Sequence, residues 1–262
     1  MYNEYLEFAK NIALHAGKIM MKFYKKDNID LKYKDDKSMV TLVDKQINSY
    51  LIEQVKKKYP EHSVCGEEES YSKPSEYVWV CDPLDGTGMY VNHIPVFMFS
   101  LALVLNGEPI IGVVFNPNED KMYHAIRGHG AYCNGKKIRV NDKQLGDLGY
   151  KTNVELFANK IIDTMSLVSE LRNVSMVSSI GSVVRSCMAI AEGDFSCDVF
   201  PGTEHANCDV AAACIIVTEA GGKVTNFYGD DQRYDIPIKG AIITNGISHN
   251  RILEYVTKYI IK

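Results

Sequence analysis

The order in which two hydrophobic periodicities follow each other constrains the fold of this chain most. Residues 3–26 and 43–59 carry apolar side chains in steps of three and four, which predicts two amphipathic helices. Short apolar runs separated by turn dipeptides follow between residues 77 and 140, as is typical of an antiparallel meander. From residue 155 onward, helical and strand-like segments alternate. This order predicts an α/β chain in which helices cover sheets.

The predicted elements divide between two halves of a single domain. We expect one domain over residues 1–262, with an N-terminal half at 1–145 and a C-terminal half at 146–262. The polar stretch 32–40 is interpreted as a loop or hairpin. Strands are expected at 77–81, 97–105, 110–115, 121–126, 131–133, 138–140, 174–177, 195–200, 224–227 and 241–244. The later helices are expected at 155–171, 182–191, 209–220 and 248–260.

Charge and cysteine content limit the classes of partner and compartment. The 262 residues are enough to bury a large core without disulfides or a structural metal. A net charge of −4 disfavours nucleic acid and anionic membranes as partners, and no apolar stretch is long enough to span a bilayer. The seven cysteines contain no C-x-x-C pair and their number is odd, which favours free thiols in a reducing compartment. We therefore expect a cytoplasmic enzyme or binding protein.

Acidic residues gather at the end of one predicted strand. Asp82 follows an apolar run, Pro83 should end the ladder there, and Gly86 allows a sharp turn. Asp82 and Asp85 should therefore crowd together with the Thr87 hydroxyl and exposed backbone carbonyls. Carboxylates this close repel each other unless a cation neutralises them, and Mg²⁺ prefers such oxygen ligands. The alternative interpretation is an ordinary surface turn, since Asp, Pro and Gly are common turn residues.

Two motifs known from phosphate-handling proteins match this sequence only in part. The D-x-D-G-T motif of aspartyl-phosphate phosphatases places its two Asp on the same side of a strand, but here Leu84 stands where the first Asp should be. A covalent aspartyl intermediate is therefore not expected. The run 130–137 resembles a P-loop, but Lys137 replaces the Ser or Thr that binds Mg²⁺ and a strand follows instead of a helix. An Asn134-Gly135 hairpin turn explains that run.

Several motifs together match one family. These are Gly-Glu-Glu at 66–68, Trp-Val-Cys-Asp-Pro-Leu-Asp-Gly-Thr at 79–87, and Asp-Val-Ala-Ala with Glu-Ala-Gly-Gly at 209–222. Val-Thr-Leu-Val-Asp at 40–44 and Gly-His-Gly-Ala-Tyr-Cys-Asn-Gly at 128–135 also match. The chain thus resembles the inositol monophosphatase family, within a larger group that includes fructose-1,6-bisphosphatases and other lithium-sensitive phosphatases.

This resemblance implies a fold, an assembly and a site. The fold is a five-layered αβαβα sandwich, and the usual assembly is a homodimer. Two or three Mg²⁺ ions are expected on Glu67, Asp82, the Leu84 carbonyl, Asp85 and Asp209. Thr87, hydrogen-bonded to Asp44, would help to activate the attacking water together with Glu67. The substrate contacts implied by the match are Lys37, Asp85, Gly86, Thr87, Gly181, Ser182, Glu204 and Asp209.

The expected activity is Mg²⁺-dependent hydrolysis of a small phosphorylated metabolite by a metal-activated water. Bound cations would reverse the sign of the acidic site and attract the phosphate dianion. Inositol monophosphate is the first candidate substrate, with fructose 1,6-bisphosphate, NADP and 3′-phosphoadenosine 5′-phosphate as alternatives. A regulatory protein of this fold that binds metal without turnover is the alternative of another class.

The sequence departs from the family pattern near Asp209. Gly202 stands seven residues before Asp209, where the family usually has the Glu that holds inositol hydroxyls, and Glu204 lies nearby in a shifted register. Cys208 replaces the frequent Trp before Asp209. Arg185 allows two interpretations: an ordinary solvated or salt-bridged arginine, or an anchor for a second anionic group of the substrate.

Overall fold

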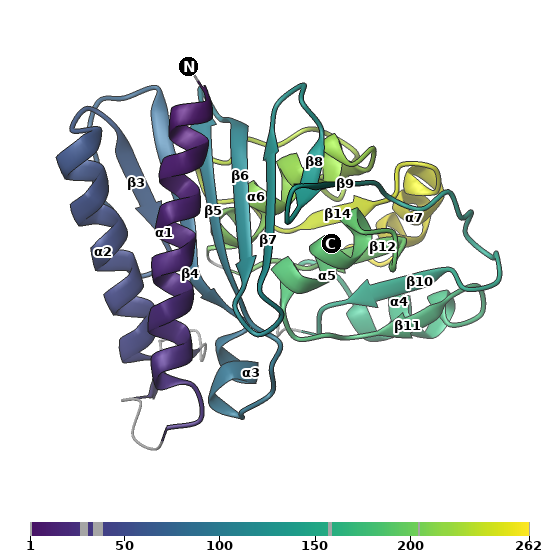
Figure 1. The fold of residues 1–262 in the computed structure, drawn as a ribbon. Coiled ribbons are helices and arrows are strands. Elements are labelled where there is room, and N and C mark those ends of the chain that lie inside the picture. The colour runs from purple at the N-terminus through teal and green to yellow at the C-terminus, as the bar shows by residue number, and fades with distance from the viewer. Residues whose placement is uncertain (1, 27–30, 34–38, 157–158, 204, 262) are drawn as a thin grey trace.

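The protein folds into five alternating layers of helices and sheets. A computed structural model describes residues 2–26, 31–33, 39–156, 159–203 and 205–261. Helices α1 and α2 cover one face of a seven-stranded sheet, and α5 and α6 lie between that sheet and a five-stranded one (Figure 1). Helices α4 and α7 form the last layer. The expected five-layered αβαβα sandwich is confirmed.

The two outer helices form where the apolar periodicity predicted them. Helix α1 spans Tyr2–Phe23 and α2 spans Leu42–Lys58, with Pro60 just beyond its end. Thr41 caps α2 by accepting a hydrogen bond from the Val43 N–H. Both helices pack their apolar faces against the seven-stranded sheet. This packing leaves the other face of that sheet to the central helices.

The seven-stranded sheet is a meander with one added strand. Its order is β3-β4-β5-β6-β7-β8-β9, and all neighbours from β4 onward are antiparallel, as predicted. The strand β3, which the sequence analysis missed, lies parallel to β4. The bounds are Ser63–Gly66 for β3, Tyr77–Asp85 for β4, Met98–Leu105 for β5, Glu108–Asn116 for β6, Lys121–Ile126 for β7, Ala131–Cys133 for β8 and Lys136–Ile138 for β9.

The five-stranded sheet has the order β11-β10-β12-β14-β13. Strand β10 pairs in parallel with β11 and β12, whereas β14 pairs antiparallel with β12 and β13. The bounds are Lys151–Val154 for β10, Met176–Ser178 for β11, Cys197–Phe200 for β12, Lys223–Thr225 for β13 and Ala241–Thr244 for β14.

The predicted helix at 155–171 is wrong in its first part. Helix α4 covers only Thr164–Leu171, and the sequence just before residue 155 forms the strand β10. Lys151 and Asn153 gave this segment no apolar run to mark a strand. It is a strand because its backbone pairs on both sides within the sheet, which is a tertiary effect that overrides weak local preference.

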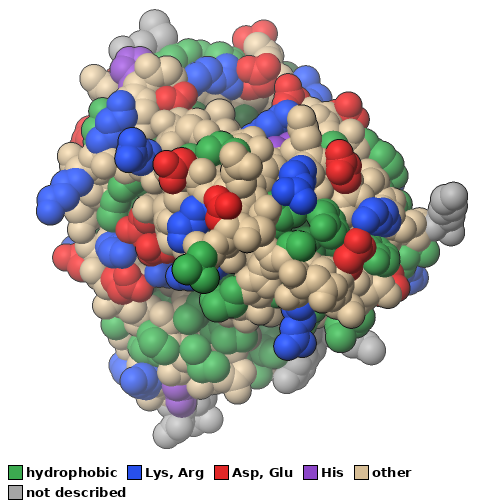
Figure 2. Space-filling model, turned by 90° about the vertical axis from the view of Figure 1, so that its right-hand side faces the viewer, with side chains coloured by type: hydrophobic (Ala, Val, Ile, Leu, Met, Phe, Trp, Pro, Cys, Tyr) green, Lys and Arg blue, Asp and Glu red, His purple; other side chains and the backbone are tan. Residues whose placement is uncertain are grey.

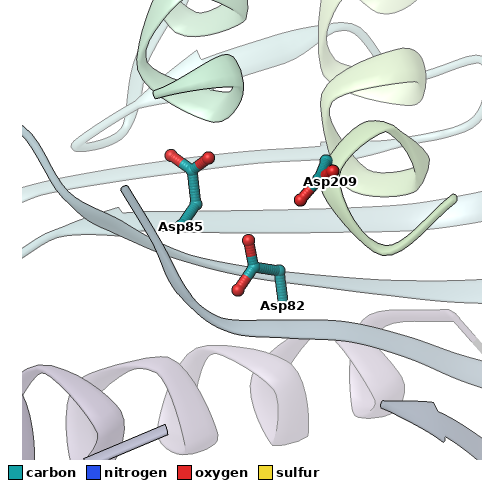
Figure 3. Close-up of side chains that lie close together, drawn as sticks. All are labelled: Asp82, Asp85 and Asp209. Carbon is teal, nitrogen blue, oxygen red and sulfur yellow. The ribbon is translucent and has the colours of Figure 1, made fainter. Parts of the chain in front are cut away.

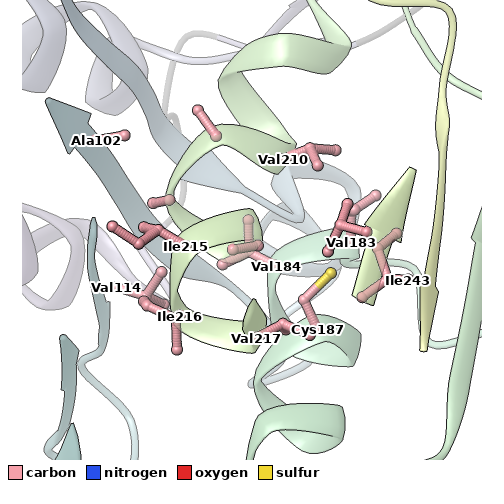
Figure 4. Packing of buried hydrophobic residues seen from close by; sticks show 14 of the residues in the cluster. Ala102, Val114, Val183, Val184, Cys187, Val210, Ile215, Ile216, Val217 and Ile243 are labelled. Carbon is pink, nitrogen blue, oxygen red and sulfur yellow. The ribbon is translucent and has the colours of Figure 1, made fainter. Parts of the chain in front are cut away.

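The central helices supply the core between the two sheets. Helix α5 spans Val183–Ala191 and α6 spans Ala206–Glu219. Most residues of α6 are buried all round, as a helix covered by sheets on two sides requires. Figure 4 shows Ile215 of α6 near Ala102 and Val114 of the first sheet, while Val183 of α5 lies beside Ile243 of the second.

Three smaller elements and one outer helix complete the described chain. The strands Lys32–Tyr33 (β1) and Met39–Val40 (β2) pair antiparallel, which confirms the hairpin interpretation. Helix α3 (Thr87–Val91) follows β4 directly, and α7 spans His249–Thr257. Among the described helices, none has the length and apolar character needed to cross a membrane. On the face drawn in Figure 2, basic and acidic side chains are interspersed.

Candidate functional site

Three buried aspartates from two distant parts of the chain meet at one point. Asp82 and Asp85 lie on β4, and Asp209 lies in the first turn of α6. Their carboxylates converge, with one oxygen of each within 4.8 Å of the others (Figure 3). Their exposed fractions are 2%, 5% and 9%. The cluster therefore sits where the C-terminal end of β4 meets the first turn of α6.

An irregularity in β4 brings its two aspartates to the same place. Asp82 pairs with Ser100 and Asp85 with Met98, so one extra residue of β4 is accommodated between them. The expectation that Pro83 ends the strand is wrong, because β4 continues to Asp85. Pro83 lies in the bulge, where no N–H group is needed for pairing with β5.

Gly86 turns the chain from β4 into α3. Its φ of +80° lies in the left-handed region, and a Cβ there would meet the Val96 carbonyl oxygen at 2.5 Å. Any side chain would therefore be strained and would clash with backbone. Thr87 consequently begins a helix immediately behind the aspartates.

The start of α6 differs from the prediction. The helix begins at Ala206, three residues earlier than expected, so Asp209 does not open it. The Asp209 carboxylate still lies in the first turn, where the positive end of the helix dipole favours negative charge. The Thr203 hydroxyl, a contact the sequence analysis missed, donates to Asp209 Oδ2 at 3.3 Å.

The three carboxylates carry strongly raised pKa values. Burial is the first cause for each of them, and the charge of Glu67 adds to it. The pKa of Asp85 rises to about 7, while those of Asp82 and Asp209 lie well above their usual range. No lysine or arginine in the described part of the chain forms an ion pair with the three. Such a set of hard, mutually repelling oxygens fits a divalent cation.

Two further predicted ligands border the aspartates. The half-buried Glu67 follows β3, and its N–H donates to the Cys81 carbonyl at 3.1 Å, beside Asp82. The Leu84 N–H donates to Asp82 Oδ1 at 2.9 Å, so the backbone of the bulge orients that carboxylate. The structure thus brings Glu67 and Leu84 to the cluster.

Thr87 and Asp44 also meet, although they are distant in sequence. The Thr87 hydroxyl lies 2.9 Å from the Leu84 carbonyl and 3.3 Å from Asp44 Oδ1. The other oxygen of Asp44 accepts from the Thr41 N–H at 2.8 Å and from the Thr41 hydroxyl at 2.5 Å. The cap of α2 therefore holds Asp44 with one oxygen directed at Thr87. Burial raises the pKa of Asp44 to about 7.

The predicted phosphate segment also reaches the cluster. The Ser182 hydroxyl donates to Asp85 Oδ2, and Ser182 Oγ accepts from the Arg185 N–H at 3.1 Å as the cap of α5. Gly181 has a φ of +79°, and a Cβ there would lie 2.5 Å from Met89 Cε. The turn before α5 thus contacts Asp85 through Ser182 and packs against Met89 of α3 at Gly181.

Of the remaining predicted contacts, Arg185 has an ionic partner in another turn, and two lie outside the described residues. Arg185 directs its guanidinium toward Glu119, 3.9 Å away in the turn between β6 and β7. Lys37 and Glu204 are not among the residues that the structure describes. At Gly202, with a φ of +87°, a Cβ would lie 2.8 Å from the Gly240 nitrogen, so no side chain fits there.

Sequence reasoning missed a buried polar group behind Asp85. Asn153, Glu155 and Asp198 come from the central part of the five-stranded sheet, and Asn153 donates to both carboxylates. One signal was present: Asp198 is a charged residue inside a predicted apolar strand, which is unusual unless it has a partner. Nothing in the sequence indicated that Glu155 lies beside it.

The five-layered sandwich, with buried carboxylates where the end of β4 meets the central helices, places this chain among α/β proteins whose donor set fits a hard divalent cation. The inositol monophosphatase family model matches residues 1–260. A "fructose-1,6-bisphosphatase/inositol-1-monophosphatase" of Aquifex aeolicus is 35% identical over 269 residues, covering 98% of this chain and 96% of that protein. The human inositol monophosphatase 1 is 32% identical over 273 residues, covering 99% and 95%.

The solved structures agree with these relatives. The Thermotoga maritima IMPase structure has a TM-score of 0.87 at 27% identity and covers 97% of each chain. The chain belongs to the inositol monophosphatase family, and it is a phosphoric monoester hydrolase. The family is metal-dependent, which agrees with the donor set of the cluster.

Proposed function

We propose that this protein hydrolyses a small phosphate monoester with Mg²⁺, and that inositol monophosphate is the first candidate for its substrate. The observation that carries the proposal is the convergence of Asp82, Asp85 and Asp209 in a buried site where no described lysine or arginine neutralises them. A dianionic phosphate would be repelled by these charges alone. Mg²⁺ held by these carboxylates would reverse the local field, and the chemistry it would supply is activation of a water and stabilisation of the leaving alkoxide.

The proposed ligands are Glu67, Asp82, the Leu84 carbonyl, Asp85 and Asp209, and they would hold two or three ions. Their oxygens come from a strand end, a bulge and a helix start, all anchored in the core. Rigid anchoring keeps such ligands oriented without a cation. The N–H groups that begin α5 and α6 face the same region, and helix N-termini favour phosphate.

Thr87 and Asp44 are proposed to prepare the attacking water with Glu67. A hydroxyl has one proton, so Thr87 donates either to the Leu84 carbonyl or to Asp44. When the Leu84 carbonyl serves as a ligand, the Thr87 proton is directed to Asp44 Oδ1. The Thr87 oxygen would then accept a hydrogen bond from the water and orient it for attack on phosphorus. As the bond from the water oxygen to phosphorus forms and the ester P–O bond breaks, the proton of the water would pass by way of Thr87 to Asp44. The alkoxide would take a proton from solvent and leave as the alcohol, and inorganic phosphate would follow without a covalent enzyme intermediate.

The alternative substrates are fructose 1,6-bisphosphate, NADP and 3′-phosphoadenosine 5′-phosphate. The name of the Aquifex relative joins fructose-1,6-bisphosphatase with inositol-1-monophosphatase, which supports testing fructose 1,6-bisphosphate beside inositol monophosphate on this chain. Gly202 stands where the family usually has the Glu that holds inositol hydroxyls, and its contact with Gly240 leaves no room for a side chain, which supports testing substrates other than inositol monophosphate.

We further propose a single domain with halves 1–145 and 146–262, which assembles as a homodimer in the cytoplasm and is inhibited by lithium. Metal dependence and lithium inhibition are typical of the family. The seven cysteines are all free, which supports a reducing compartment. Small phosphorylated metabolites, and neither nucleic acid nor membranes, are the proposed partners.

The test is phosphate release from the four substrates, with Mg²⁺ and with EDTA. We expect activity that EDTA abolishes and that Asp85→Asn lowers by at least a hundredfold. Asp163→Asn is the matched control, because Asp163 is an exposed helix cap on α4. Activity that is indifferent to EDTA and to Asp85→Asn would refute the proposal. Mg²⁺ binding without hydrolysis of any ester would instead indicate a regulatory protein without turnover.

A further inference from the structure

Two buried carboxylates behind the site have no role in the proposed reaction. Glu155 is 1% exposed and Asp198 is not exposed at all. The Asn153 amide lies between them and donates to Glu155 Oε1 at 2.8 Å and to Asp198 Oδ1 at 3.1 Å. Burying two charges costs free energy unless hydrogen bonds satisfy them, so the partners of these oxygens indicate what the network does.

The partners of this network are consecutive residues of one turn. Glu155 Oε2 accepts from the Gly181 N–H at 3.2 Å and from the Ser179 hydroxyl at 3.3 Å. Asn153 Oδ1 accepts from the Ile180 N–H at 3.0 Å. Three donors from residues 179–181 are therefore bound to the sheet, and the orientation of the turn is determined by these bonds.

The same turn ends at the residue that touches Asp85. Ser182 follows Gly181 directly, and its hydroxyl donates to Asp85 Oδ2. From the other side, Ser186 of α5 donates to Asp198 Oδ2, so the network is bonded to both ends of the segment that carries Ser182. Hydrogen bonds from the sheet to residues 179–181, the peptide link from Gly181 to Ser182, and the hydrogen bond of Ser182 thus connect the sheet with the carboxylate of Asp85.

We propose that Glu155 is a positioning residue, which holds the 179–181 turn so that Ser182 orients the Asp85 carboxylate for the cation. An apolar side chain could fill the same volume, but it could not accept hydrogen bonds from Gly181 and Ser179. Outer groups that orient ligands in this way typically change metal affinity or activity by about 10- to 100-fold. The inference rests on the proposed metal-binding role of Asp85.

The test is a double-mutant cycle of Glu155→Gln and Ser182→Ala, read by calorimetric titration of the full chain with Mg²⁺ alone. The glutamine keeps the shape but turns an N–H group toward either Asn153 or Gly181. We expect about 10- to 100-fold weaker Mg²⁺ binding in each single variant. The double variant should bind no more weakly than the weaker single one, because Glu155 acts through Ser182.

Glu192→Gln is the matched control. Glu192 caps the opposite end of α5 and pairs with Lys121 at 3.1 Å, far along the helix from the turn. It should leave Mg²⁺ affinity within about twofold. Unchanged affinity in Glu155→Gln, or additive losses in the double variant, would overturn the proposal.

Hydrogen exchange of the unaltered protein tests the same proposal without any variant and without metal. The Ile180 and Gly181 amides should exchange slowly although they lie in a turn, because Asn153 and Glu155 accept their protons. Fast exchange at both would refute the positioning role. Absence of Mg²⁺ binding by the unaltered chain would refute the proposed function instead, and slow exchange would still support the positioning role.

Discussion

Replacing Asp85 by Asn should stabilise the metal-free protein while it lowers phosphate release by at least a hundredfold. The pKa of Asp85 rises from 3.8 to about 7, first through burial and then through the charges of Glu155 and Glu67. Because the pKa of this acid is higher in the folded state than in the unfolded state, protonation of Asp85 stabilises the fold. Its stabilising contribution is complete below pH 3.8 and is lost as the pH rises through 7.

The magnitude follows from that interval. At about 1.4 kcal/mol per pH unit, the charged Asp85 costs the metal-free protein about 4 kcal/mol by pH 8. Asparagine removes this cost but disturbs a hydrogen bond with Ser182, which offsets about 1 kcal/mol. The net gain of about 3 kcal/mol corresponds to a rise in Tm on the order of 6–12 °C.

In Mg²⁺, the unaltered protein should become more stable than Asp85→Asn. A ligand that binds only the folded state stabilises it in proportion to the logarithm of its concentration over Kd. The unaltered protein should therefore gain stability on addition of Mg²⁺ at pH 8, whereas Asp85→Asn should gain little. The proton and the cation compete for the same carboxylate, and the proton wins increasingly below the pKa of about 7. The gain in stability from Mg²⁺ should therefore shrink toward pH 5.

Urea unfolding at pH 5, 6.5 and 8, in EDTA and in Mg²⁺, measures these quantities. Asp163→Asn provides the contrast, because hydrogen bonds from Ser166 lower the pKa of Asp163. That variant should lose stability at pH 8 with or without Mg²⁺. If Asp85→Asn is no more stable than the unaltered protein in EDTA at pH 8, or if the difference is as large at pH 5 as at pH 8, the reasoning from burial is refuted.

Three further substitutions test individual contacts of the site. Thr41→Ala removes the cap that orients Asp44, so urea unfolding should show a loss of about 1 kcal/mol and phosphate release should show a lower kcat. Gly86→Ala places a Cβ 2.5 Å from the Val96 carbonyl oxygen at positive φ; we expect a loss of at least about 2 kcal/mol in thermal unfolding, and near-complete loss of phosphate release. Arg185→Ala should leave KM for mono- and bisphosphorylated substrates unchanged, because the guanidinium already has Glu119 as its ionic partner at 3.9 Å. A KM raised only for the bisphosphate would show that Arg185 anchors a second anionic group.

The local motif around β4 was predictable because its residues are close in sequence. An apolar run ending in Asp82, Pro83, Asp85 and Gly86 indicates a strand that stops in a tight acidic turn, whatever surrounds it. The geometry of that turn was not predictable. Whether Pro83 ends the ladder or lies in a bulge depends on the register of β5, and neighbouring strands set that register.

Amphipathic periodicity located α1 and α2 because a helix that covers one sheet face needs a single apolar stripe. The same signal failed near residue 155, where the strand β10 is held by partners on both sides. The apolar periodicity also placed the start of α6 three residues too late. The first turn of that helix is buried by the fold, although no periodic pattern distinguishes it from the loop before it.

The sequence by itself determined the types of oxygen ligand, the carboxylate excess at three motifs and the order of helices and strands. Tertiary structure alone decided which of these groups meet. Asp209 reaches Asp82 because α6 packs against β4, and Thr87 reaches Asp44 because α2 packs against that strand. The network of Glu155 and Asp198 also exists only after folding, since its hydrogen bonds join segments that no local periodicity connects. Side-chain chemistry is a local property, whereas its convergence depends on long-range packing.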